Sequence, residues 1–500
     1  MNHNNLNRTT KIDLSAEEFK KIGHELVERI AEFIGTIDSI PVTRAENEET
    51  IRKFLGSENP LPEIGLNAND LIRNTTDLLI NHSLFNGHPK FWGYITSSPA
   101  PLGMLGDLLA SAINQNVGAW NLSPMASEIE AQTIRWIASL IGFPTSAGLI
   151  VSGGNVANYI GFLAAFRAKT GLEIRNKGIN SLNIQPAVYC SAETHTWIQK
   201  AADLFGLGTD CIRWIKTNKN QKMDMLSLKN TIEKDKKSGF YPMLVVGTAG
   251  SVSTGAIDPL NDIAELCQDY NLWFHIDGAY GGFAAAVPEL EEVFHGIEKA
   301  DSIAIDPHKW LYAPLEAGCV LVKNPEHLTN TFSYHPPYYN FEQSAVNYVD
   351  YGIQNSRGFK ALKVWLMLQQ MGRKGYQDLI REDISLAKYA HNLLSGSKNI
   401  ETFACNLSIT TFRYVPEDFQ NLSQNQKVED YLNELNRTIL EKIEKSGKFF
   451  LSNAIINEKF LLRMCIVNFR TKAKDIELFS EFLLETGPKI DTELRSNFML

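Results

Sequence analysis

The stretch DSIAIDPHKWLYAP, residues 301–314, places a lysine between two apolar runs, SIAI on one side and AGCVLV on the other. Short apolar runs of this kind predict buried strands, so His308 and Lys309 fall in the turn between them. A salt-bridged or solvated lysine is one interpretation. The other is that Trp310 and the strands disfavour the ammonium form, which leaves an amine that is nucleophilic toward a carbonyl carbon.

Three further loops place chemically useful residues at the ends of predicted strands. SGGNVAN, residues 152–158, sets Gly153 and Gly154 before a helix, where free N–H groups and the helix dipole favour an anion; a plain tight turn is the alternative. His195, in AETHTW, is either a functional imidazole or a hydrogen-bonded bystander. Asp277, in WFHIDGAYGG, is either a cap for the next segment or the partner of a buried cation.

Considered jointly, these four loops match the needs of one ligand. A pyridine that carries an aldehyde and a phosphate requires a lysine amine, an acid opposite its ring nitrogen, a flat group on its face and an anion site. Pyridoxal phosphate meets that description, and the sequence therefore predicts it as the cofactor. No metal site is expected, because the six cysteines are scattered and form no Cys-x-x-Cys pair.

The order of predicted elements indicates an α/β protein with three parts. Residues 91–380 alternate short apolar runs with helical ones, which is typical of a large, mostly parallel sheet wrapped by helices. Ligands of such sheets bind where loops leave the carboxyl ends of the strands. Residues 1–90 form a helical segment that includes an amphipathic helix, whose apolar stripe must cover this chain or a partner. Residues 381–500 form a smaller α+β domain.

Composition narrows the class of protein further. The net charge of −9 and the pI of about 5.7 argue against a nucleic-acid partner. No apolar run approaches the ~20 residues of a membrane helix, and the amino terminus lacks the apolar core of a secretory signal. We therefore expect a cytoplasmic protein with reduced cysteines. A dinucleotide dehydrogenase is disfavoured, because no Gly-x-Gly-x-x-Gly occurs between a strand and a helix.

Six motifs, in order along the chain, resemble those of the group II pyridoxal-phosphate-dependent amino acid decarboxylases. They are HPKFWGYI, NQNVGAWNLSPMASEIE, SGGNVAN, HIDGAYGG, DPHKWL and NSRGFKALKVWL. That family includes the aromatic-L-amino-acid, glutamate and histidine decarboxylases, and the resemblance covers nearly the whole chain. It implies the aspartate-aminotransferase-like fold of pyridoxal-phosphate-dependent transferases. It also implies a homodimer with active sites at the subunit interface, on which the amino-terminal segment packs.

The resemblance also implies roles for single residues. Lys309 would form the internal aldimine with the cofactor, and Asp277 would pair with the pyridine nitrogen and keep it protonated. His195 would stack on one face of the ring, with Ala279 against the other. The residues implied for the phosphate site are Gly153, Gly154, Asn155, Asp306 and His308.

Reaction type depends on a further position, Tyr338 in FSYHPPYYNFEQ, residues 332–343. It falls where the family has a loop tyrosine that protonates the α-carbon after carbon dioxide leaves; without the resemblance, this is only a proline-stiffened surface loop. Relatives that make aldehydes lack that hydroxyl or replace the stacking histidine. With both present, the resemblance implies a carboxy-lyase that converts an L-amino acid to its amine. Aldehyde synthesis or carbon–carbon lysis on the same fold, and a non-catalytic scaffold, are the alternatives.

Substrate choice is predicted from HPKFWGYI. Trp92 and Tyr94 are expected to line the substrate pocket and favour an aromatic amino acid, with an acidic amino acid as the alternative. Two positions depart from the family pattern. Val252 replaces one of two adjacent hydroxyl residues found in many relatives. Gly118 stands where the animal aromatic decarboxylases present a bulky aromatic side chain to the substrate from the neighbouring subunit, which implies a roomier pocket.

Overall fold

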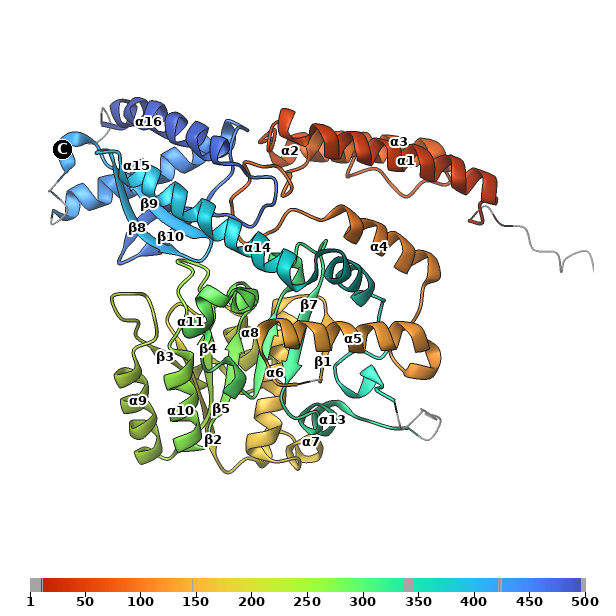
Figure 1. Ribbon diagram of the computed structural model, residues 1–500, viewed down its shortest axis with the longest axis vertical. Helices are drawn as coiled ribbons and strands as arrows, with labels where there is room; N and C mark the ends of the chain where they lie inside the picture. Colours follow the sequence, from red (N-terminus) through yellow and green to blue (C-terminus); the bar gives the residue numbers. More distant parts are fainter. Residues whose placement is uncertain are drawn as a thin grey trace, which may run out of the picture.

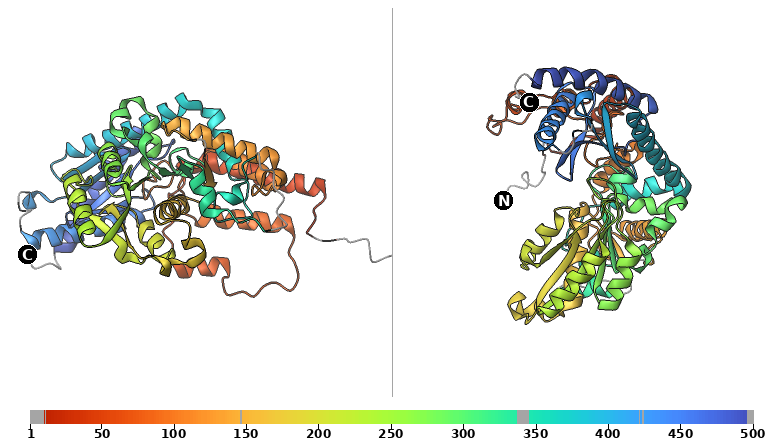
Figure 2. Two further views of the ribbon diagram at one scale, coloured as in Figure 1. Left: turned by 90° about the horizontal axis from the view of Figure 1, so that it is seen from below. Right: turned by 90° about the vertical axis from the view of Figure 1, so that its left-hand side faces the viewer.

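The computed structural model describes residues 10, 12–145, 147–336, 345–420, 422 and 425–495. Its three parts are arranged as a large domain at one end, with a smaller domain and an amino-terminal helical segment side by side at the other (Figure 1). The right-hand view of Figure 2 shows the small domain, in blue, above the large one, in green and yellow. The expected α/β architecture is therefore confirmed.

A seven-stranded mixed sheet forms the centre of the large domain, in the order β1-β7-β6-β5-β4-β2-β3. Only β7 runs antiparallel to its neighbours, and the remaining neighbours pair in parallel. Strands β1, β5, β6 and β7 are buried along their whole length, which explains why they read as continuous apolar runs. The strands are β1 (Gly148–Val151), β2 (Gln185–Ser191), β3 (Ile212–Ile215), β4 (Phe240–Thr248), β5 (Trp273–Asp277), β6 (Ser302–Ile305) and β7 (Gly318–Val322).

Helices pack around this sheet and complete one continuous apolar core. The helix that follows β1 lies across β4, β5, β6 and β7, and its first turn begins at the glycines predicted to bind an anion. The helices of the large domain are α4 (Pro101–Ile113), α5 (Pro124–Ile141), α6 (Gly154–Thr170), α7 (Ile174–Lys177), α8 (Trp197–Leu204), α9 (Met225–Lys237), α10 (Leu260–Tyr270), α11 (Glu291–Phe294), α12 (Pro307–Trp310) and α13 (Glu326–Phe332).

The small domain has its own antiparallel sheet and its own apolar core. Its strands follow the order β10-β11-β9-β8. The helix α14 (Ala361–Ser395) packs on α4 and α5 of the large domain and continues across residue 380 to β8 and β9. The other elements are β8 (Ile400–Asn406), β9 (Ile409–Tyr414), α15 (Gln426–Lys445), β10 (Ser452–Ile456), β11 (Lys459–Cys465) and α16 (Ala473–Arg495).

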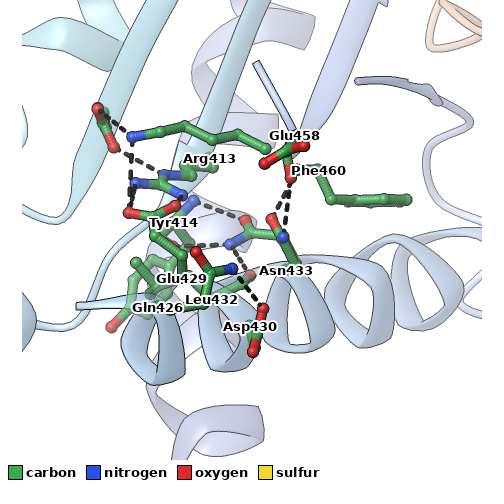
Figure 3. A network of polar contacts seen from close by, with 12 residues as sticks. Arg413, Tyr414, Gln426, Glu429, Asp430, Leu432, Asn433, Glu458 and Phe460 are labelled. Atoms are coloured by element: carbon green, nitrogen blue, oxygen red, sulfur yellow. Dashed lines mark hydrogen bonds and ion pairs between the residues drawn. The ribbon is translucent and has the colours of Figure 1, made fainter. Parts of the chain in front are cut away.

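A buried ion network ties the sheet of the small domain to its helix α15 (Figure 3). Arg413 on β9 is 1% exposed and donates to Glu401 at 2.7 Å and to both oxygens of Glu429 at 2.7 and 3.0 Å. On the same helix, the Asn433 side chain accepts from Phe460 N at 2.7 Å. The contacts with Glu401 and Glu429 compensate the buried charge of the Arg413 guanidinium, which would otherwise be costly.

The amino-terminal segment contains α1 (Ala16–Thr36), α2 (Glu48–Leu55) and α3 (Ala68–His82). A capping box begins α1, because Glu18 N donates to Ser15 Oγ at 3.2 Å and Ser15 N donates to Glu18 Oε2 at 3.0 Å. Helix α1 packs on α3, yet none of its residues, all of which the structure describes, is buried. No helix in the described part of the chain combines the length and apolar character needed to cross a bilayer.

Candidate active site

A cavity of about 310 Å³ lies at the carboxyl ends of the central strands. Loops that follow β1, β2, β4, β5 and β6 contribute its walls, because the ends of parallel strands meet at one edge of a sheet. All nine residues predicted to bind the cofactor line this one cavity. They are Gly153, Gly154, Asn155, His195, Asp277, Ala279, Asp306, His308 and Lys309.

Lys309 lies in the short helix α12, directly after β6. Its Nζ is 3.0 Å from Oδ2 of Asp306, a carboxylate that is only 1% exposed. The sequence neighbours of Lys309 suggested apolar surroundings, but a buried carboxylate lies beside its amine. The ion pair, which was the alternative interpretation, is therefore present. Oδ1 of Asp306 is buried and has no hydrogen-bond partner among the described residues.

The turn that carries Lys309 is fixed from behind by a buried carboxylate on α14. Asp383 Oδ2 accepts a hydrogen bond from Trp310 Nε1 at 2.7 Å and another from the Tyr312 hydroxyl. Burial raises the pKa of Asp383 to about 7, although both of these donors act in the opposite direction. The residue after Lys309 is thus held by helix α14.

His308, the neighbour of Lys309, faces both the cavity and the loop before β7. Its Nδ1 lies 2.7 Å from Ala317 O, and its backbone N donates to the same oxygen at 3.1 Å. Burial lowers the pKa of His308, and the nearby carboxylate of Asp306 opposes that change.

Asp277 ends strand β5 and is 7% exposed. Oδ2 accepts a hydrogen bond from Trp197 Nε1 at 2.7 Å, and Oδ1 accepts one from Ala279 N at 3.2 Å. Two neutral donors therefore fix the carboxylate without neutralising it. This carboxylate can hold a proton on a basic ring nitrogen in the cavity.

His195 lines the same cavity, in the loop that follows β2, and remains solvent-exposed. Desolvation of the ring lowers its pKa, Asp277 acts in the opposite direction, and the Lys309 ammonium adds to the lowering. A neutral, flat imidazole suits stacking on an aromatic ring.

The glycines before α6 form a tight backbone cradle. Gly153 has a φ of 155°, a conformation that favours glycine. A Cβ on Gly154 would lie 2.7 Å from Asp306 Oδ2 and 3.1 Å from the Cβ of Ala279, so a side chain there would collide with the cavity wall. The N–H groups of the first turn of α6 thus remain accessible to an anion.

These groups fit pyridoxal phosphate. The Lys309 amine can bind an aldehyde carbon, Asp277 can face a ring nitrogen, and the cradle of Gly153 and Gly154 can receive a phosphate.

Three residues that line the cavity had no signal of their own in the sequence. Trp197 holds Asp277, Asn158 donates to Gly154 O at 2.8 Å, and Thr248 ends β4 beside the cavity. Trp197 follows His195 by two residues, a spacing that could have been noticed. Val252 also lines the cavity, so the departure from the family pattern at that position falls where it was expected.

The prediction that Trp92 lines the substrate pocket is wrong. Its side chain is fully buried in the core of the small domain, where it donates to Thr471 Oγ1 at 3.1 Å and packs on Phe449 and Phe479. Tyr94 is 60% exposed and does not line the cavity described above, so its role in substrate binding stays a prediction.

Two other expectations concern Tyr338 and Gly118. Tyr338 lies outside the described residues. At Gly118, a Cβ would lie 2.2 Å from Asn355 O, so the close approach of that carbonyl requires glycine. The missing side chain therefore has a packing cause, and it does not by itself indicate a roomier pocket.

Comparisons with known proteins agree with this geometry. Residues 52–415 match the pyridoxal-dependent decarboxylase conserved domain. The chain is 33% identical over 471 residues to an aromatic-L-amino-acid decarboxylase of Bacillus atrophaeus, covering 93% of this chain and 94% of that protein. It is 30% identical over 478 residues to a phenylacetaldehyde synthase of a Rosa hybrid cultivar, with coverage of 93% and 92%. The crystal structure of Oryza sativa TDC with PLP and tryptamine superposes with a TM-score of 0.88 at 25% identity, covering 96% of this chain and all of that one.

Proposed function

The chain belongs to the pyridoxal-dependent decarboxylase family, and from that membership we propose that it decarboxylates an aromatic L-amino acid to the corresponding amine. The enzyme is a carboxy-lyase, and its cofactor is pyridoxal 5'-phosphate. The observation that supports the proposal most directly is the single cavity shared by Lys309, Asp277, His195 and the glycine cradle.

We assign each of these side chains a role toward the cofactor. When bound, pyridoxal phosphate supplies an electron-poor ring that accepts the electron pair left by departing carbon dioxide. Lys309 Nζ holds the aldehyde carbon of the cofactor, and the Asp277 carboxylate holds a proton at the ring nitrogen. His195 and Ala279 orient the ring between them. Gly153, Gly154, Asn155, Asp306 and His308 form the phosphate site.

Decarboxylation without oxidation requires a proton donor for the α-carbon, and we assign that role to the hydroxyl of Tyr338, assisted by His195. Both side chains are present in this sequence. Because a phenylacetaldehyde synthase is among the relatives, the amine and the aldehyde are the two products to separate.

The aromatic substrate is supported by the relatives and by the walls of a neighbouring cavity. A tyrosine decarboxylase of Petroselinum crispum is 30% identical over 463 residues. A second cavity, of about 390 Å³, shares His308 with the first, and its walls include Phe85, Pro99 and Met104. The apolar part of these walls suits a planar apolar side chain, and the Arg470 guanidinium in the same cavity can pair with a carboxylate.

Measurement of carbon dioxide, amine, aldehyde and peroxide from a panel of L-amino acids tests the proposal. We expect amine and carbon dioxide in equal amounts from phenylalanine, tyrosine or tryptophan. Activity confined to glutamate or aspartate would contradict the aromatic substrate. Aldehyde and peroxide formed in place of amine would contradict simple decarboxylation.

We also propose that the enzyme is a homodimer, because a large apolar surface of the amino-terminal segment has no partner within the described part of the chain. A groove of about 710 Å³ between α1, α3 and α4 is lined by side chains that include Phe19, Leu71 and Leu108, which are 62%, 44% and 54% exposed. Large apolar side chains that gather in one exposed groove favour an interaction site, and a second copy of the chain would cover them.

A cytoplasmic location belongs to the same proposal. All six cysteines are described, and all are free thiols. Five of them are buried, and unpaired thiols are typical of a reducing compartment.

A further inference from the structure

A chain of buried polar side chains runs behind the cofactor cavity. Trp273 Nε1 donates to Ser302 Oγ at 2.9 Å, and Ser302 Oγ lies 2.7 Å from His275 Nδ1. His275 Nε2 lies 2.7 Å from Asn158 Oδ1, and Asn158 Nδ2 donates to Gly154 O at 2.8 Å. None of the four side chains is more than 2% exposed. The chain therefore connects β5 and β6 to the first turn of α6.

The chemistry of its two ends fixes the direction of every hydrogen bond. An indole N–H can only donate, so Ser302 Oγ accepts from Trp273. Gly154 O can only accept, so the Asn158 amide nitrogen faces it and Oδ1 faces His275. His275 must then carry its hydrogen on Nε2, and Nδ1 accepts from the Ser302 hydroxyl. Burial lowers the pKa of His275 to about 4, in agreement with a neutral ring of one tautomer.

His275 itself does not line the cavity, but it supports two groups that do. Helix α6 lies so close that a Cβ on Gly161 would be 2.6 Å from His275 Cε1. The imidazole also packs edge-on against Trp197, with ring centroids 5.7 Å apart, and Trp197 donates to Asp277. The ring is thus placed between the start of α6 and the carboxylate at the end of β5.

We propose that His275 is a positioning residue that sets the first turn of α6 for the phosphate of the cofactor, acting through Asn158, an inference that rests on the proposed phosphate site. Without the Nε2–H donor, the Asn158 amide is free to rotate and to release Gly154 O. The N–H groups of the first turn then lose their fixed direction toward the anion. A phenylalanine at this position keeps a ring against Trp197 and removes the bonds to Asn158 and Ser302, so it should change the affinity for pyridoxal 5'-phosphate and leave that for pyridoxal unchanged.

The test is the affinity of the full-length, cofactor-free protein for pyridoxal 5'-phosphate and for pyridoxal, each followed by the absorbance of the bound ligand. For His275→Phe we expect the dissociation constant for pyridoxal 5'-phosphate to rise about tenfold, and that for pyridoxal to stay within about twofold. An unchanged ratio of the two constants would overturn the proposal. If this variant does not fold, Ser302→Ala removes the donor to His275 Nδ1 together with the acceptor of Trp273 Nε1, and it should raise the dissociation constant for pyridoxal 5'-phosphate relative to that for pyridoxal in the same way.

Two controls separate the possible causes of failure. Trp273→Phe disturbs the same core but leaves the Ser302–His275–Asn158 bonds, so it should lower thermal stability and keep the ratio. Gly154→Ala places a methyl group in the cradle itself. If Gly154→Ala keeps the ratio, the phosphate site is assigned wrongly. If Gly154→Ala changes the ratio of the two dissociation constants and His275→Phe does not, only the role of His275 is wrong.

Discussion

At Lys309, a cation and a carboxylate are held 3.0 Å apart, in a site where Asp306 is 1% exposed. A buried charge without its partner costs far more than the pair contributes to stability. Each of these side chains therefore compensates the buried charge of the other. This effect on stability is separate from any role toward the cofactor.

Lys309→Ala should abolish covalent attachment of the cofactor and also destabilise the cofactor-free protein, by about 2 kcal/mol, because Asp306 is left uncompensated. Thermal unfolding and the absorbance of protein freed of loose cofactor measure the two effects. Adding Asp306→Asn to Lys309→Ala should recover most of the stability and none of the attachment. Equal stability of the single and double variants would show that the ion pair is not formed.

Asp277→Asn tests the proton held at the ring nitrogen. The amide oxygen still accepts from Trp197, so the fold and cofactor binding should persist. Loss of the charge should lower kcat by a factor of about 10² to 10³, the usual effect of removing one electrostatic group from an active site. Steady-state kinetics with bound cofactor confirmed by absorbance provide the measurement, and turnover at the parent rate would refute the assignment.

At the scale of elements, strand β9 depends on helix α15 for the charge of Arg413 (Figure 3). Burial raises the pKa of Glu429, but the hydrogen bonds and charge of Arg413 outweigh it and leave the pKa lowered. An acid whose folded pKa is depressed stabilises the fold above its ordinary pKa of 4.5 and loses that contribution as the pH falls through the folded value.

Arg413→Met should therefore destabilise the protein by about 3 kcal/mol at pH 7, since two carboxylates lose their buried partner. The difference from the parent should shrink as the pH falls below 4.5, because the carboxylate of Glu429 becomes protonated. Thermal unfolding from pH 7 to pH 3.5 measures both effects. A difference that does not change with pH would mean that the lost packing, and not the lost charge, is responsible.

Local patterns predicted the elements and much of the site, for physical reasons. Buried strands read as short apolar runs, and the carboxyl ends of parallel strands must meet, so loops far apart in sequence could be grouped correctly. The prediction for Trp92 was wrong because its contacts are non-local: its hydrogen-bond partner Thr471 is 379 residues away in the sequence. The roles of Trp197 and His275 were hidden for the same reason, since a hydrogen bond across strands leaves no periodic pattern.

At the scale of the whole molecule, the exposed apolar groove of α1, α3 and α4 predicts the oligomeric state. Phe19→Asp places a charge in this groove, and in a symmetric dimer the change acts twice. The dissociation constant of the dimer should rise by about 10² or more. Sedimentation velocity over a range of concentrations is the measurement. Leu226→Asp is the matched control, because Leu226 is 69% exposed on α9, outside the groove.

A dimer that is unaffected by Phe19→Asp would place the subunit interface elsewhere. A monomeric parent protein would contradict the proposed homodimer itself.

Helix α14, which is kinked at Gly372, has a practical consequence for anyone who wishes to express the large domain alone. A truncation at residue 380 looks reasonable from the sequence, yet it cuts this helix between Ala361 and Ser395 and discards Asp383. Trp310 and Tyr312 would then lack their shared acceptor, directly beside Lys309. A useful fragment must extend at least through Ser395, and even then it exposes the face of α14 that packs on β8 and β9.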